Sequence, residues 1–156
     1  MRLQLVGLWL SAAALLGAAK PPDTHVVVVV NSANVTSSMT REQVAKIFLR
    51  QMATWDGGEE ILPVDQIEKA PARAAFARDV QGQSVKALKI YWQQRIFSGD
   101  ESPPPERVTD SDVLTYIRSN AGAIGYVVEG TDLGAGVKAL VIVRTSRDAT
   151  AVGTKS

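Results

Sequence analysis

Five consecutive valines, residues 26–30 in HVVVVVNS, restrict the fold more than any other feature of this 156-residue chain. Their β-branched side chains favour a strand over a helix. A strand with one face in water would alternate apolar and polar residues, and this segment does not alternate. The run therefore predicts a strand that is covered on both faces, as in the sheet of a layered α/β domain.

Side chains that can cap helix starts recur along the chain. Thr40 with Gln43 and Thr109 with Asp112 have the spacing of a capping box, in which two residues bond each other's backbone. Ser84 can likewise accept a hydrogen bond from the first turn of a helix. Apolar residues at helical spacing follow all three positions. Helices are therefore expected at residues 40–51, 85–97 and 109–120.

A further helix is expected to begin at Pro71, which suits a first turn, and to end at Gly82. Short apolar segments predict additional strands at residues 61–64, 123–128 and 137–143. Strands that alternate with helices are typical of layered α/β domains. The sequence thus predicts one α/β domain with a mostly parallel sheet flanked by helices.

The helix at 85–97 carries the aromatic residues of KIYWQQRIF. Its apolar stripe consists of Leu88, Tyr91, Trp92 and Ile96. We expect this stripe to pack into the core, and a face that stacks on a ligand is the alternative.

The first 19 residues have the three-part pattern of a secretory signal. Arg2 precedes an apolar run, and Gly17 and Ala19 suit cleavage after position 19. A membrane anchor is the competing interpretation, but the run is short for a span of about 20 residues. We expect an exported, periplasmic protein without a membrane span, built from four segments: a signal at 1–19, a flexible lead-in at 20–25, the domain at 26–143 and a polar, disordered tail at 144–156.

Composition argues against several functions. Cleavage after Ala19 would remove Arg2 and no acid, which leaves as many basic as acidic residues. Such a neutral protein lacks the basic excess that nucleic-acid binding usually needs. The chain has no cysteine, which excludes disulfides and thiolate metal sites. Its single histidine, His25, lies at a strand edge with no sign of a catalytic triad. We therefore expect a non-enzyme without metal or cofactor.

The loop NSANVTSS, residues 31–38, follows the valine strand and is rich in short polar side chains. Ligands of open α/β sheets bind beyond the carboxyl ends of strands, where Asn31 and Ser32 are expected. The loop could be a polar recognition rim. It could equally be an ordinary loop whose side chains bond its own backbone.

The stretch DQIEKAPARAAF, residues 65–76, predicts a strand, a loop and a helix in succession. Such a junction suits an anion, because free N–H groups at a helix start lie at positive potential. Gln66, Lys69 and Arg73 are its polar and basic side chains, and no hydroxyl or glycine accompanies them. The stretch is therefore a candidate anion site with few donors.

Several segments together resemble the substrate-binding proteins of phosphate ABC transporters. They are VVVNSANVTSSMTREQVAKIFLRQMATW, ILPVDQ, ARAAF, KIYWQQRIFSG and NAGAIGYV, which run from about Val26 to Val143. The resemblance implies the type II periplasmic-binding-protein fold, in which two lobes hold the anion between them. A chain of this length is expected to form one such lobe.

The phosphate loop of that family has an Arg, three spacer residues and then Ser-Gly-Thr-Arg at a helix start. Alignment through Arg73 places Gln66 at the first Arg and Ala70-Pro71-Ala72 at Ser-Gly-Thr. Pro71 also removes one N–H donor. The resemblance therefore implies an oxyanion site of which only Arg73 is kept.

Two functions are consistent with these features. The first is an exported, non-catalytic, solute-binding-like protein of this family, with phosphate binding in doubt. Its candidate contacts to a small oxyanion are Asn31, Ser32, Gln66, Lys69 and Arg73. The second is a periplasmic protein–protein interaction module, whose exposed lobe face meets a protein partner or a second copy.

Overall fold

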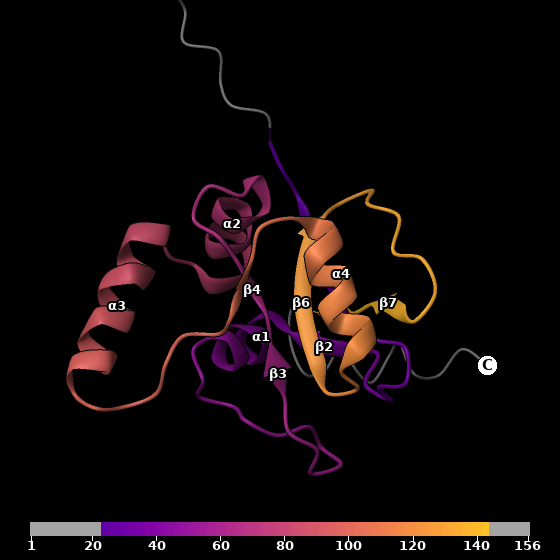
Figure 1. Cartoon of the computed structure of the whole chain (residues 1–156), viewed down its shortest axis with the longest axis horizontal. Helices are drawn as coiled ribbons and strands as arrows, with labels where there is room; N and C mark the ends of the chain where they lie inside the picture. The colour runs from indigo at the N-terminus through magenta and orange to yellow at the C-terminus, as the bar shows by residue number, and fades with distance from the viewer. Residues whose placement is uncertain (1–22, 144–156) are drawn as a thin grey trace, which may run out of the picture.

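The computed structural model describes residues 23–143 (Figure 1). The expected signal at 1–19 and tail at 144–156 lie outside the described residues. The valine run forms β1 (Val26–Asn31), and its last three valines are at most 2% exposed. The prediction of a strand that is covered on both faces is confirmed.

β1 lies inside a four-stranded sheet with the order β3-β6-β1-β7. β6 (Ala123–Val128) and β7 (Val137–Ala139) run antiparallel to β1, whereas β3 (Leu62–Pro63) runs parallel to β6. The predicted α/β class with flanking helices is confirmed, but the sheet is mixed rather than mostly parallel. Strand direction depends on which strands become neighbours, and both neighbours of β1 come from the other end of the domain.

Two short parallel ladders lie outside this sheet. β2 (Ser38–Thr40) pairs with β8 (Val141–Val143), and β4 (Asp65–Gln66) pairs with β5 (Glu106–Arg107). The predicted strand at 137–143 is therefore two strands, which are separated at Leu140 and join different sheets. Pairing partners that are distant in sequence make this division, so the apolar run by itself does not show it.

The helices begin where the capping patterns and, for the helix at Pro71, the proline predict. They are α1 (Arg41–Phe48), α2 (Pro71–Phe76), α3 (Val85–Phe97) and α4 (Asp110–Ser119). Thr40 and Thr109 complete their capping boxes, and Ser84 accepts a bond from the Ala87 N–H. α2 continues into a π-helical turn, η1 (Ala77–Gln81), which Gly82 ends in the left-handed conformation. α1 is shorter than expected and ends at Phe48.

Two apolar clusters cover the opposite faces of the sheet. Val28 and Val30 belong to one cluster with residues of α1 and α2, whereas Val29 belongs to the other with residues of α4. Successive strand side chains point to opposite faces, so a run without polar residues needs cover on both. Figure 1 shows α4 against β6, with α1 and α2 on the other side of the molecule's centre. The core is thus a sheet between two helical layers.

α3 lies at the edge of the molecule, away from the sheet (Figure 1). Leu88 and Trp92 of the predicted stripe are buried, but Ile96 is 56% exposed. The next residue, Phe97, is 96% exposed. The stripe was therefore predicted correctly only in its first part, because α3 packs on the domain along part of its length. Within residues 23–143, no helix is both long and apolar enough to cross a bilayer.

Candidate functional site

The strand–loop–helix junction places polar side chains in the interior. Asp65 and Gln66 of β4 are 4% and 1% exposed, and Arg73 of α2 is 6% exposed. Two backbone hydrogen bonds hold β4 against β5. The Asp65 N–H donates to the Pro105 carbonyl, and the Ile67 N–H donates to the Arg107 carbonyl. The junction is therefore a buried polar centre rather than an open loop.

Arg73 is bound by acceptors from its own domain. One terminal nitrogen lies 3.3 Å from Oδ2 of Asp65, and the other donates to Oε1 of Gln81 at 3.2 Å. Gln81 comes from the π-helical turn η1, which changes the direction of the side chains that follow α2. The guanidinium charge is thus balanced by an internal carboxylate.

Tyr126 of β6 completes this network. Its hydroxyl donates a short hydrogen bond to Asp65, and its ring stacks on Phe76 with centroids 3.9 Å apart. Burial raises the pKa of the Tyr126 hydroxyl far above its usual range, so this group remains a donor. Burial also raises the pKa of the Asp65 carboxyl, while Arg73 and the Tyr126 hydroxyl oppose that rise.

The Gln66 side chain bonds other parts of the domain. Its side-chain Nε2 donates to Asp110 Oδ1 at 2.9 Å and to the Tyr126 carbonyl at 2.8 Å. Asp110 in turn accepts the Val128 N–H at 3.0 Å. Gln66 therefore connects β4 to the start of α4 and to β6, and its amide is committed to the protein.

The start of α2 offers few donors for an anion. Pro71 has no N–H, and the N–H groups of Ala70 and Arg73 donate to the Ile67 and Ala70 carbonyls. Ala70 makes no side-chain cap bond. Lys69 is exposed on the loop. The backbone donors expected of an anion site at a helix start are thus mostly absent or occupied.

The NSANVTSS loop lies elsewhere. Asn31 is buried and donates through Nδ2 to the carbonyls of Ile117 and Arg118, at the end of α4, while its Oδ1 accepts the Ala33 N–H. Ser32 is exposed, and its N–H donates to the Gly136 carbonyl. Asn31 therefore fits the interpretation as an ordinary loop. Its side chain bonds the last carbonyls of α4 and an N–H of its own loop.

The five candidate residues do not converge. Asn31 bonds the last turn of α4, whereas Gln66 bonds Asp110 in its first turn, at the opposite end of a ten-residue helix. Gln66 and Arg73 share the buried network, through Asp65 and Tyr126. Lys69 and Ser32 remain on the surface.

The network includes residues that sequence reasoning missed, namely Asp65, Gln81, Asp110 and Tyr126. A tyrosine inside the buried strand AIGYVV carries a signal, because a buried hydroxyl needs a partner. The partner itself was not predictable, since Asp65 and Tyr126 are 61 positions apart. Gln81 carries no such signal, because the π-helical turn that directs it is not visible in the sequence.

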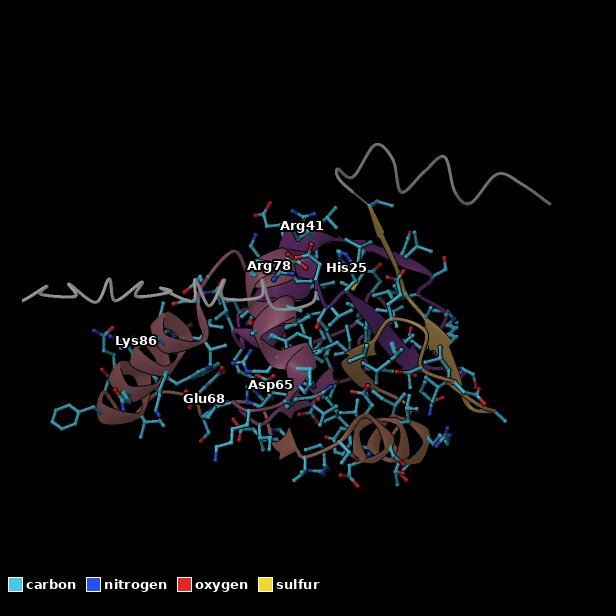
Figure 2. All side chains as sticks on the ribbon, turned by 90° about the horizontal axis from the view of Figure 1, so that it is seen from above. His25, Arg41, Asp65, Glu68, Arg78 and Lys86 are labelled. Carbon is cyan, nitrogen blue, oxygen red and sulfur yellow. The ribbon has the colours of Figure 1, made fainter. Side chains whose placement is uncertain are left out.

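His25 lies in another part of the molecule. Figure 2 shows it beside Arg41 and Arg78, away from Asp65. Arg78 Nε lies 2.6 Å from Asp79 Oδ1, and this hydrogen bond is the main cause that lowers the pKa of the Asp79 carboxyl. The nearby His25 and Arg41 lower it to a smaller degree. Within residues 23–143, no group of three histidines and carboxylates could hold a metal ion.

Comparison with known proteins identifies solved structures with a similar fold. No protein-family model and no curated protein matches the chain. Among solved structures, an ABC-type phosphate transport receptor from Vibrio cholerae is similar over 80% of this chain, with a TM-score of 0.59 and 23% identity. A protein described as a phosphate ABC transporter substrate-binding protein from Clostridium perfringens, with bound phosphate, has a TM-score of 0.58 and 16% identity over 85% of this chain.

PstS from Borrelia burgdorferi is similar to the same degree, with a TM-score of 0.59 and 12% identity over 78% of the chain. The chain spans about half the length of these proteins, with 50%, 51% and 48% of them covered. The structure therefore has the fold of part of a phosphate-binding receptor, and the predicted resemblance is confirmed at the level of the fold.

Proposed function

We propose that this chain is an exported, non-catalytic, solute-binding-like lobe that does not hold phosphate at its strand–loop–helix junction. The buried ion pair between Arg73 and Asp65 carries this proposal. The similar receptors are transport proteins by name, which favours binding over catalysis. Export to the periplasm rests on the signal pattern at 1–19, and the mass of the exported protein tests cleavage after Ala19.

An incoming phosphate would have to replace Asp65 at the guanidinium. That exchange would leave a buried carboxylate without its cation, which is costly in a low-dielectric interior. The loop offers no compensation, because alanine and proline stand where hydroxyl and glycine donors are expected. The Asp65 carboxylate therefore already binds the Arg73 guanidinium that a phosphate would need.

A thermal-shift titration with inorganic phosphate tests this proposal. A ligand at 100 times its Kd adds about 2.7 kcal/mol of stability, which would raise the Tm of a domain of this size by roughly 5 °C or more. We expect phosphate at millimolar concentration to raise the Tm no more than sulfate or chloride at equal ionic strength. A saturable rise with phosphate alone would contradict the proposal.

A second candidate is a protein–protein interaction module. It is favoured by the apolar end of α3, where Ile96 and Phe97 are exposed, with Ile90 further along the helix 46% exposed. Exposed apolar residues that gather on one element are typical of contact surfaces. A second copy of the chain supplies the same surface, so the proposed contact is an isologous pairing through α3.

A further inference from the structure

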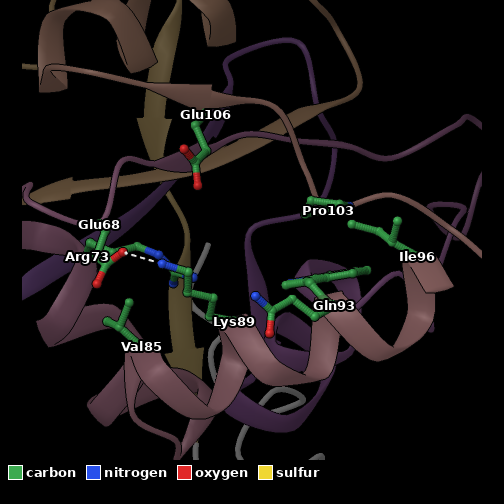
Figure 3. A pocket seen from close by; sticks show the side chains of 9 residues that line it. Glu68, Arg73, Val85, Lys89, Gln93, Ile96, Pro103 and Glu106 are labelled. Atoms are coloured by element: carbon green, nitrogen blue, oxygen red, sulfur yellow. Dashed lines mark hydrogen bonds and ion pairs between the residues drawn. The ribbon is translucent and has the colours of Figure 1, made fainter.

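A cavity of about 370 Å³ lies beside the buried network, between α3 and the β4–β5 ladder (Figure 3). This volume is in the range of small-molecule sites in proteins. α3 forms one side of the cavity. The opposite side comes from the loop after β4, from β5 and from the segment around Pro103.

One part of the cavity wall is apolar. Val85, Trp92 and Ile96 of α3 line it, and Pro103 lies across from Ile96 (Figure 3). Trp92 is 7% exposed and packs edge to face against Tyr91, with ring centroids 5.0 Å apart. The indole is therefore fixed in position and can contact the hydrocarbon part of a ligand.

The other part is charged, and its cations already have partners. Lys89 Nζ lies 3.4 Å from Glu68 Oε2. A terminal nitrogen of Arg73 lies 3.3 Å from Oδ2 of Asp65, which is not itself part of the cavity lining. Glu106 of β5 points into the cavity from the other side (Figure 3). Within residues 23–143, no hydrogen bond or ion pair engages its carboxylate. The cavity thus presents one solvent-exposed carboxylate without a partner among the described residues, opposite an apolar wall.

We propose that this cavity binds a small organic cation, a primary ammonium group on an apolar stem. The ammonium group pairs with Glu106 and lies near Glu68, while the stem packs against Trp92 and Ile96. An anion would find both cations occupied and would meet Glu106. The inference goes beyond the proposed function, because it concerns a ligand of the opposite charge, held in the cavity beside the junction by Glu106 and α3.

The test is a titration of the purified chain, followed through the indole N–H resonances in ¹⁵N-correlated NMR spectra. Phenethylammonium is the probe, 2-phenylethanol is its uncharged counterpart, and N-acetyl-lysinamide represents a lysine side chain of a polypeptide. Trp92 reports on the cavity. Trp55, whose indole N–H donates to the Gly122 carbonyl at 3.1 Å, serves as the internal reference.

We expect a saturable shift of the Trp92 resonance with a Kd of about 1 mM or tighter, and no shift of Trp55. The alcohol should bind about two- to fivefold more weakly, and Glu106→Gln should weaken ammonium binding by a similar factor, about two- to fivefold. Glu129→Gln, which changes an exposed carboxylate elsewhere, should leave the Kd unchanged. Tighter binding of phenethylammonium than of N-acetyl-lysinamide would assign the site to free amines, and the reverse order to a polypeptide side chain.

Equal binding of alcohol and ammonium, an unchanged Kd in Glu106→Gln, or no saturable shift with either cation would overturn the inference. Each of these results is independent of the phosphate titration, so failure here leaves the proposed function untouched.

Discussion

At the scale of single residues, the central feature is a cation that the domain neutralises by itself. Arg73 lies between Asp65 and Gln81, and Asp65 also accepts from Tyr126. Buried pairs of this kind add little net stability, but removal of one partner leaves the other charge without compensation. The network therefore makes Arg73 a structural residue before any ligand is considered.

Arg73→Met should lower the free energy of unfolding by about 3–5 kcal/mol, because Asp65 would remain buried without its cation. Urea denaturation of the purified chain measures this change. Arg78→Met is the matched control, since Arg78 pairs with Asp79 on the surface, where water screens both charges, and its cost should be much smaller than that of Arg73→Met. Equal costs for the two substitutions would rule out a special role for the buried pair.

The cost of Arg73→Met should also depend on pH. Burial already raises the pKa of Asp65 in the folded state, and loss of Arg73 raises it further. A raised carboxyl pKa adds stability below the unfolded value, about 3.9, and this stability is lost as the pH rises through the folded pKa. The destabilisation should therefore be smaller near pH 4.5 than near pH 7.5 in urea midpoints. In an Asp65→Asn background the cost should not vary with pH, and a variation there would assign the effect to another group.

At the scale of elements, close contact between β6 and its neighbours depends on a missing side chain. A Cβ on Gly125 would lie 2.8 Å from a methyl group of Val64 and 2.9 Å from one of Val113. Val64 precedes β4 and Val113 belongs to α4, so this glycine lets α4 and the buried junction approach the same strand. The polar network around Asp65 needs this close packing, because its hydrogen bonds join β4, β6 and the start of α4.

Gly125→Ala should cost about 1–3 kcal/mol of unfolding free energy through overpacking. Gly57→Ala is the control, because a Cβ at Gly57 meets nothing within 4 Å, and its effect should stay within about 0.5 kcal/mol. Thermal or urea unfolding compares the two. A neutral Gly125→Ala would show that β6 and α4 can separate without loss of stability.

At the scale of the whole molecule, the four-stranded sheet lies between two helical layers, and α3 is only partly covered by the rest of residues 23–143. The inner end of α3 packs through Leu88 and Trp92, whereas Phe97 at its outer end has almost no contact with the domain. The apolar end of α3 is therefore available to another molecule, and the cavity beside it lies at the same edge.

If this end pairs with a second copy, light scattering should show dimers at micromolar to millimolar concentration. Phe97→Ser should shift the molecules to monomers. The same substitution should change the stability of the monomer by less than about 0.5 kcal/mol, because an exposed side chain makes few contacts. A chain that stays monomeric with or without Phe97 would remove self-association as the role of this surface.

The sequence by itself determined the local features of this protein. The valine run, the capping boxes of Thr40 and Thr109 and the stop at Gly82 were predicted correctly, because neighbouring residues decide them. The lack of hydroxyl and glycine donors at the start of α2 was equally visible. The class of fold followed from the order of these elements.

Only the tertiary structure decided the direction of the strands around β1 and the partners of the polar side chains. Arg73 was recognised as a candidate anion ligand, but Asp65, Gln81 and Tyr126 show that its charge is used inside the domain. The physical reason is the same in both cases. Pairing between distant segments depends on how the whole chain packs, and a local pattern of residues carries no record of it.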